Sequence, residues 1–133
     1  MIDKSNKYRD IEQFLFMIYD EKNGIKTSDF YGDVLFIGMG SLYFPKKISA
    51  DSITIVEKYE DVIEMQKNNF LPEWTIIKDD GYVFTTNKKF DVIMLDMWYE
   101  MITEKELNSH INRYTEFLKE NGKIIYLKTI KIK

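Results

Sequence analysis

Five short apolar runs constrain the fold of this chain more than any other feature of its sequence. Most of them are rich in Val and Ile and do not alternate with polar residues, which is typical of strands buried on both faces of a parallel sheet. Two segments between the runs, 60–69 and 104–119, carry apolar residues at helical spacing. Alternating strands and helices predict an α/β fold with a doubly wound, mostly parallel sheet. The predicted strands are residues 34–37, 53–56, 74–77, 92–95 and 124–127.

Local signals set the expected ends of the helices. Thr103-Glu104-Lys105-Glu106 has the pattern of a capping box, and Asn121-Gly122 is typical of a helix end. We therefore expect the last helix to run over 104–119 and to end at Asn121-Gly122. A further amphipathic helix is predicted before the first strand, because one helical face carries Ile11, Phe14, Leu15 and Ile18.

Length and composition limit the classes of function. The 133 residues suit one domain, which we expect to span 1–133 with 1–30 as an N-terminal helix and lead-in. The net charge of -3 argues against a broad nucleic-acid surface. The sequence has no cysteine, which excludes disulfides, thiolate nucleophiles and Cys-based zinc sites. Its single histidine, His110, is expected at the surface or boundary of a helix, so no metal site is predicted.

Targeting signals are missing from the sequence. The N-terminus is charged from its third residue, and no stretch approaches the roughly 18 consecutive apolar residues of a membrane span. We therefore expect a cytoplasmic protein with a small-molecule partner and no membrane association. The chain stops soon after the fifth predicted strand, and a homodimer is one assembly that would cover the sheet edge left exposed there.

A glycine turn follows the first predicted strand. Gly38 and Gly40 come directly after it, and Glu57 ends the next apolar run. Glycines at such a turn let the backbone approach a ligand, and a carboxylate at the end of the second strand suits ribose hydroxyls. These residues predict a nucleoside site. The competing interpretations are a turn without a ligand and a Glu57 that caps the following helix.

The residues after the turn bear on which nucleoside it would hold. A dinucleotide site requires a third glycine and a long helix whose N-terminus faces the pyrophosphate. Here Tyr43 stands at the third glycine position, and only a short crossover helix fits before residue 51, with Pro45 in its first turn. A ligand without phosphates, such as S-adenosylmethionine, needs no such helix. The sequence therefore favours it over NAD, and a nicotinamide-dependent oxidoreductase is the less favoured alternative.

Four motifs follow one another in order along the chain: the glycine-rich segment 34–40, Val56-Glu57, an Asp-Gly-x-x-Phe segment within 78–84, and a strand with the residues after it within 90–99. Through them the sequence from Asp33 to Leu127 resembles the class I S-adenosylmethionine-dependent methyltransferase fold, in which the last of these is the fourth motif. This resemblance implies a Rossmann-like sheet in the order 3-2-1-4-5, truncated after its fifth strand. It also implies that Gly38, Gly40 and Glu57 hold the nucleoside and that Asp80, followed by Gly81, meets the adenine amino group.

Within this fold, the branch that transfers a propyl group looks most similar. Val56-Glu57 and 80–84 resemble spermidine synthases, and 36–42 resembles nicotianamine synthases. This likeness implies decarboxylated S-adenosylmethionine as an alternative cofactor and aminopropyl or aminocarboxypropyl transfer as an alternative to methyl transfer. Phe36 stands where many methyltransferases carry an acid, and Leu42 replaces the third glycine of spermidine synthases.

The fourth motif implies a catalytic role for Asp96. Its carboxylate would face the reacting centre, where it could accept a proton from an amine or stabilise positive charge. Trp98 and Tyr99 are candidate substrate residues, since aromatic faces attract a cationic sulfonium or amine. A strand-end cap for Asp96 and packing under a loop for the two aromatic residues are the alternatives. We expect an S-adenosylmethionine-dependent transferase with a small acceptor, and the alternative is a non-catalytic binding or assembly module of the same fold.

Overall fold

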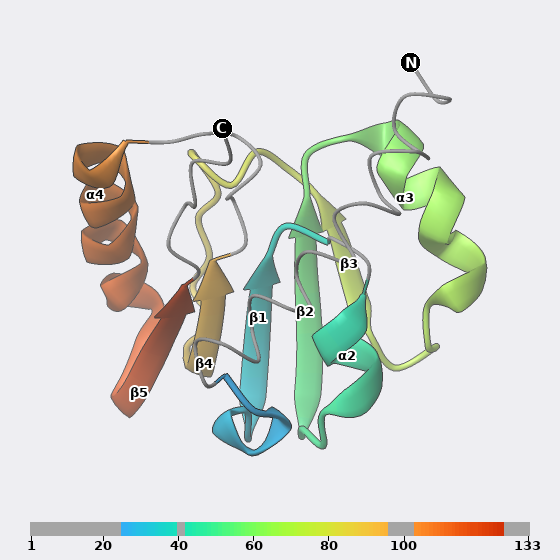
Figure 1. The fold of residues 1–133 in the computed structure, drawn as a ribbon, viewed down its shortest axis with the longest axis horizontal. Helices are drawn as coiled ribbons and strands as arrows, with labels where there is room; N and C mark the ends of the chain where they lie inside the picture. Colours follow the sequence, from blue (N-terminus) through green and yellow to red (C-terminus); the bar gives the residue numbers. More distant parts are fainter. Residues whose placement is uncertain (1–24, 40–41, 96–102, 127–133) are drawn as a thin grey trace.

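The structure is a computed structural model that describes residues 25–39, 42–95 and 103–126. Within these ranges the chain forms one sheet of five parallel strands in the order β3-β2-β1-β4-β5 (Figure 1). The predicted fold class and strand order are therefore confirmed. The strands are β1 (Asp33–Ile37), β2 (Ser52–Glu57), β3 (Thr75–Lys78), β4 (Phe90–Leu95) and β5 (Leu118–Tyr126).

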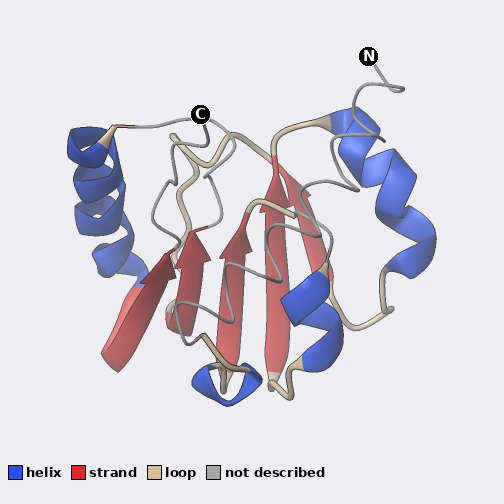
Figure 2. Ribbon diagram, in the orientation of Figure 1, coloured by secondary structure: helices blue, strands red, loops and turns tan. Residues whose placement is uncertain are grey.

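The helices lie beside the sheet (Figure 2). As predicted, the connection after β1 holds only a short helix with Pro45 in its first turn. The predicted capping box is also present, because the Thr103 hydroxyl accepts from the Glu106 N–H at 3.1 Å and Glu106 Oε1 accepts from the Thr103 N–H at 3.0 Å. The predicted N-terminal helix lies outside the described residues. The helical elements are η1 (Thr27–Asp29), α2 (Tyr43–Lys47), α3 (Glu60–Gln66), η2 (Lys67–Asn69), α4 (Glu104–Tyr114) and η4 (Thr115–Phe117).

Each face of the sheet carries its own apolar cluster, because successive strand residues point to opposite faces. Val34 and Phe36 of β1 pack on one face with Phe44 of α2 and Val62 of α3. Leu35 and Ile37 pack on the other face with Phe90, Tyr114 and Phe117. None of the described helices is both long enough and apolar enough to cross a bilayer.

The end of α4 differs from the sequence prediction. The helix ends at Tyr114 and η4 follows, so that Leu118 already pairs with Phe90 of β4. Asn121-Gly122 lies inside β5, where the pairing with β4 shifts register, and Asn121 has a φ of 68°. The Asn-Gly pair therefore forms an irregularity in an edge strand rather than a helix end. Its local conformation is the left-handed one that the sequence suggested, but in a different element.

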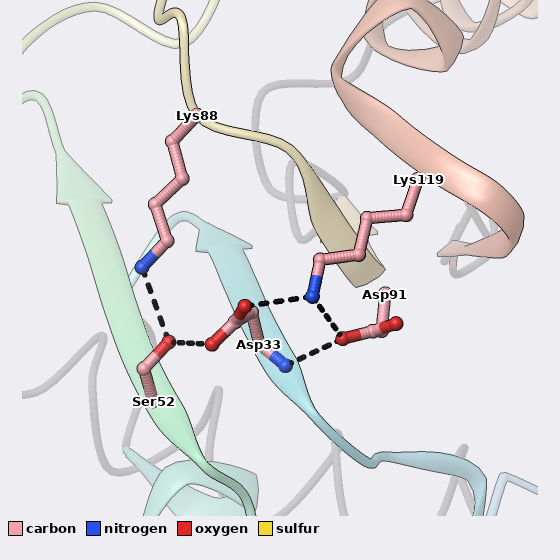
Figure 3. Close-up of polar contacts among 5 residues, drawn as sticks. All are labelled: Asp33, Ser52, Lys88, Asp91 and Lys119. Atoms are coloured by element: carbon pink, nitrogen blue, oxygen red, sulfur yellow. Dashed lines mark hydrogen bonds and ion pairs between the residues drawn. The ribbon is translucent and has the colours of Figure 1, made fainter.

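Charged and polar residues link the amino ends of four strands (Figure 3). Lys119 Nζ of β5 lies 2.8 Å from Asp33 Oδ2 of β1 and 3.0 Å from Asp91 Oδ2 of β4. The Asp33 N–H donates to the same Asp91 oxygen at 2.8 Å, and the Ser52 hydroxyl of β2 donates to Asp33 Oδ1 at 2.6 Å. Lys88 Nζ approaches the Ser52 hydroxyl at 3.2 Å. We call these five residues the amino-end cluster.

The cluster shifts the pKa values of its members. Hydrogen bonds from Lys119 and Ser52 hold the pKa of Asp33 below its usual value. The Asp33 N–H, and then Lys119, lower the pKa of Asp91, while the two carboxylates raise the pKa of Lys119. A carboxyl group whose pKa is lower in the folded state stabilises the fold above its unfolded pKa of about 3.9, and that stabilisation is lost as the pH falls through the folded value.

We expect the free energy of unfolding to fall as the pH is lowered from about 5 towards 3, because both carboxylates take up protons there in the unfolded chain but only at lower pH in the folded one. Asp91→Asn should lower the free energy of unfolding at pH 7 and make its acid dependence shallower, since the neutral amide loses the attraction to Lys119. Urea unfolding across this pH range measures both effects. Asp51→Asn, at an exposed position outside the cluster, is the matched control. If the free energy of unfolding of Asp91→Asn and Asp51→Asn changed equally with pH, Asp91 would not be a source of the acid dependence.

Gly32 precedes this cluster with a φ of +67°, and a Cβ atom there would lie 2.1 Å from Asp91 Oδ2. Gly32→Ala should cost about 1 to 3 kcal/mol of unfolding free energy, because it combines backbone strain with displacement of a bound carboxylate. Urea unfolding of Gly32→Ala in the native and Asp91→Ala backgrounds separates the two parts. Gly32→Ala should lower the free energy of unfolding less in the Asp91→Ala background than in the native one. Equal losses in the two backgrounds would show that the clash with the Asp91 carboxylate does not contribute.

Candidate functional site

The carboxyl ends of β1, β2 and β3 bring three of the predicted site segments to one edge of the sheet. The Gly38 N–H donates to the Val56 carbonyl at 2.8 Å, which joins the turn after β1 to the end of β2. The Asp79 N–H donates to the Glu57 carbonyl at 3.1 Å, which joins the end of β2 to the segment after β3. Because the strands are parallel, Gly38, Glu57 and Asp80 leave the sheet on the same side (Figure 1). This is the edge at which open α/β sheets bind ligands.

The turn after β1 depends on backbone conformations that most residues avoid. Gly38 has a φ of 99°, a region that glycine reaches without strain. Leu42 has a φ of 64°, and its side chain is fully buried in the core at the start of α2. A left-handed leucine is strained, so its burial must hold the backbone in place. Gly40, the second predicted glycine, lies outside the described residues.

Glu57 is a buried carboxylate at the centre of this edge, and its residue is 1% exposed. Its Oε1 accepts from the Met39 N–H at 2.9 Å, and its Oε2 accepts from the Tyr59 N–H at 3.1 Å. Burial of a carboxylate is unfavourable unless hydrogen bonds stabilise it, and these two donors do so. The acid thereby ties the glycine turn to the end of β2. The second of these bonds also reaches the start of α3, because Tyr59 is its N-cap residue and makes no cap hydrogen bond with its own side chain.

Asp80 begins a tight turn after β3. Its Oδ1 accepts from the Tyr82 N–H at 2.9 Å, and its carbonyl accepts from the Val83 and Phe84 N–H groups at 3.0 and 2.9 Å. Its Oδ2 lies 3.9 Å from Lys58 Nζ, which follows Glu57 in the chain. Asp79 instead bonds locally, because its Oδ1 accepts from the Asp80 N–H at 2.7 Å. Asp80 therefore forms this turn, and it stands at the predicted edge.

Three residues of α4 contact this turn, and none of these contacts was predicted from the sequence. The Tyr114 hydroxyl donates to the Gly81 carbonyl at 2.6 Å. The His110 ring packs edge-on against Tyr82, with ring centroids 4.3 Å apart. Arg113 Nη2 donates to the Phe84 carbonyl.

His110 is 7% exposed, so the expected surface or boundary position was wrong. Its helix presents it to the turn rather than to solvent, because Tyr82 covers the ring. The available sequence signal for these contacts was the polar hydroxyl of a tyrosine on an apolar helix face. A buried tyrosine usually finds a hydrogen-bond partner, but periodicity alone does not say which one. Burial raises the pKa of Tyr114 to about 12, so the hydroxyl keeps its proton near neutral pH.

The predicted catalytic residue Asp96 and the predicted substrate residues Trp98 and Tyr99 lie outside the described residues. The strand that leads to them, β4, pairs Leu95 with Ile37 at the carboxyl edge of the sheet. Among the described residues, no group of three or more His, Asp or Glu side chains is gathered as metal ligands would be.

Comparison with known proteins bears on the family. No protein-family model matches the chain. It is similar to an uncharacterized methyltransferase of Bacillus cereus (strain 03BB102), with 26% identity over 102 residues that cover 75% of this chain and 48% of that protein. The chain thus spans about half the length of the curated relatives it matches.

Solved structures share the architecture. The DhpI-SAH complex superposes with a TM-score of 0.66 and 15% identity, covering 91% of this chain and 65% of that one. The N-methyltransferase NodS from Bradyrhizobium japonicum WM9, in complex with S-adenosyl-L-homocysteine (SAH), gives 0.60 and 18%, covering 71% and 51%. The chain has a class I methyltransferase fold. The finer likeness to spermidine and nicotianamine synthases gains no support from these comparisons.

Proposed function

We propose that this chain is an S-adenosylmethionine-dependent transferase that methylates a small-molecule acceptor. The observation that carries the proposal is the buried carboxylate of Glu57, held against the glycine turn by the Met39 N–H at 2.9 Å. A fold alone does not require an acid at that position, since an apolar side chain would be buried there at lower cost. The methyltransferase fold and the methyltransferase relatives support the same assignment.

The described residues fit an adenosyl ligand without phosphates. Gly38 turns with no side chain between the backbone and a ligand, and a carboxyl group such as that of Glu57 has oxygens that accept several hydrogen bonds, which suits ribose hydroxyls. Asp80 stands at the next strand end, where its carboxylate would accept from the adenine amino group. The five residues of α2 follow a left-handed Leu42, an arrangement unlike the long helix that a pyrophosphate site uses.

S-adenosylmethionine supplies an activated methyl group on a sulfonium, so the protein contributes mainly by aligning the acceptor. We assign Gly38, Gly40, Glu57, Asp80 and Gly81 to the nucleoside. Asp96 is proposed to receive the proton of the acceptor or to stabilise its positive charge. Trp98 and Tyr99 are proposed to lie against the cationic centre.

Calorimetric titration of this chain with S-adenosylmethionine, SAH, methylthioadenosine and NAD tests the proposed ligand class. We expect heat with the first two and none with NAD. If none of the adenosine ligands binds, the transferase proposal fails and a non-catalytic module of the same fold replaces it. Product analysis with candidate amines then identifies the reaction, because SAH reports methyl transfer and methylthioadenosine reports propyl transfer.

Glu57→Gln should weaken SAH binding by about 1 to 3 kcal/mol, since a neutral amide replaces the charged acceptor of the ribose hydroxyls. The amide oxygen can still accept from the Met39 N–H, whereas the amide nitrogen cannot accept from the Tyr59 N–H, so we expect a folded but less stable variant. Calorimetry measures the affinity, and circular dichroism confirms the fold. Glu64→Gln, at an exposed position on α3 that contacts Lys67, is the control and should bind like the native chain. Native affinity in a folded Glu57→Gln variant would place the ribose elsewhere.

A further inference from the structure

Helix α4 holds the turn at 80–84 from one helical face. His110, Arg113 and Tyr114 are spaced so that they lie on the same side of the helix. They contact Tyr82, the Phe84 carbonyl and the Gly81 carbonyl respectively. Two of these contacts are hydrogen bonds to backbone carbonyls at opposite ends of the turn, so the helix fixes its backbone frame rather than one side chain.

The contact from Tyr114 is the most tightly enclosed of the three. The residue is fully buried, and its ring packs edge-on against Phe117 with centroids 5.5 Å apart. Gly81 is buried as well. Removing the hydroxyl would leave the Gly81 carbonyl without this donor in an environment that water does not readily reach, where an unsatisfied polar group is costly. The ring packing would persist in a phenylalanine variant, which removes the hydroxyl together with its bond to the Gly81 carbonyl and its interaction with Arg113.

The same turn orients Asp80. Its side chain accepts from the Tyr82 N–H, and its carbonyl accepts from the Val83 and Phe84 N–H groups. Rotation of the peptide at Gly81 would move the Tyr82 N–H and with it the carboxylate. The donor on the Gly81 carbonyl therefore acts on the direction of the Asp80 carboxylate, although Tyr114 does not itself contact that carboxylate in any interaction described above.

We propose that Tyr114 is a positioning residue that sets the preference of this site for adenine over a 6-oxo purine. The inference rests on the proposed function, because it assumes that Asp80 receives the adenine amino group. An amino group donates to a carboxylate, whereas the carbonyl of hypoxanthine repels it. That discrimination requires the carboxylate to be held in one direction, which the Tyr114 hydroxyl accomplishes through Gly81.

The test compares two ligands on the Tyr114→Phe variant: SAH and its deaminated analogue, S-inosylhomocysteine. Calorimetry should show SAH binding about three- to tenfold weaker, the equivalent of one lost hydrogen bond, with little change for the inosine analogue. The ratio of the two affinities should therefore fall. If Tyr114→Phe binds both ligands more weakly by the same factor, Tyr114 only supports the fold and the proposal fails. The proposal also fails if Tyr114→Phe binds both ligands with native affinity.

Two further variants complete the experiment. Tyr31→Phe removes a hydroxyl from a residue that is 42% exposed and precedes β1, at the far end of the sheet, and should keep the native ratio. Arg113→Lys removes the guanidinium donor to the Phe84 carbonyl at the other end of the turn and should also lower the ratio. It keeps the proposal testable if Tyr114→Phe does not fold. If the native chain binds neither SAH nor S-inosylhomocysteine, both the proposed function and this inference fail. If the native chain binds SAH, and Tyr114→Phe and Arg113→Lys keep the native ratio of the two affinities, only this inference fails.

Discussion

The hydrogen bond between the Met39 N–H and the Glu57 carboxylate connects the two strand ends on which the site depends. A carboxylate that is 1% exposed is costly to bury, and backbone donors from both sides offset that cost. The bond also explains why the turn after β1 can take an unusual shape, since its backbone is attached to the neighbouring strand rather than only to itself. The acid is therefore part of the scaffold before any ligand is present, and a ligand that uses it meets a group already fixed in direction.

The segment after β3 is held differently, because the residues that support it come from helix α4. Asp80 bonds within its own turn, and α4 holds that turn through Tyr114 and Arg113. Two carboxylates at one edge are thus fixed by separate means: one by the backbone of adjacent strands, the other by a helix about thirty residues later in the chain. Changes in α4 packing would act on one half of the site and leave the other half intact.

Much of this could be predicted from the sequence, and the failures have a common cause. Apolar runs predicted the strands, and local motifs predicted the short α2 and the capping box at Thr103, because these depend on residues close in the chain. The strand order was implied by the resemblance to the methyltransferase fold instead. The predicted helix end at Asn121-Gly122 is wrong, since the same dipeptide suits an irregular edge strand and only the pairing of Leu118 with Phe90 decides between the two. The amino-end cluster and the contacts of His110 and Tyr114 join residues far apart in sequence, which periodicity does not reveal. Gly40, Asp96, Trp98 and Tyr99 stay predictions.

The conformation and burial of Leu42 limit which residues can replace it. Its backbone sits in a left-handed conformation beside the glycine turn, while its side chain is fully buried with Phe36 and Phe44. A glycine there would relieve the backbone but empty part of the core, and another apolar residue would fill the core but keep the strain. The hydrophobic core and the turn of the candidate site therefore share Leu42, so a substitution that suits one of them affects the other. Families built on this arrangement would change the two together, and a chimera that exchanged only the turn would inherit a mismatched core.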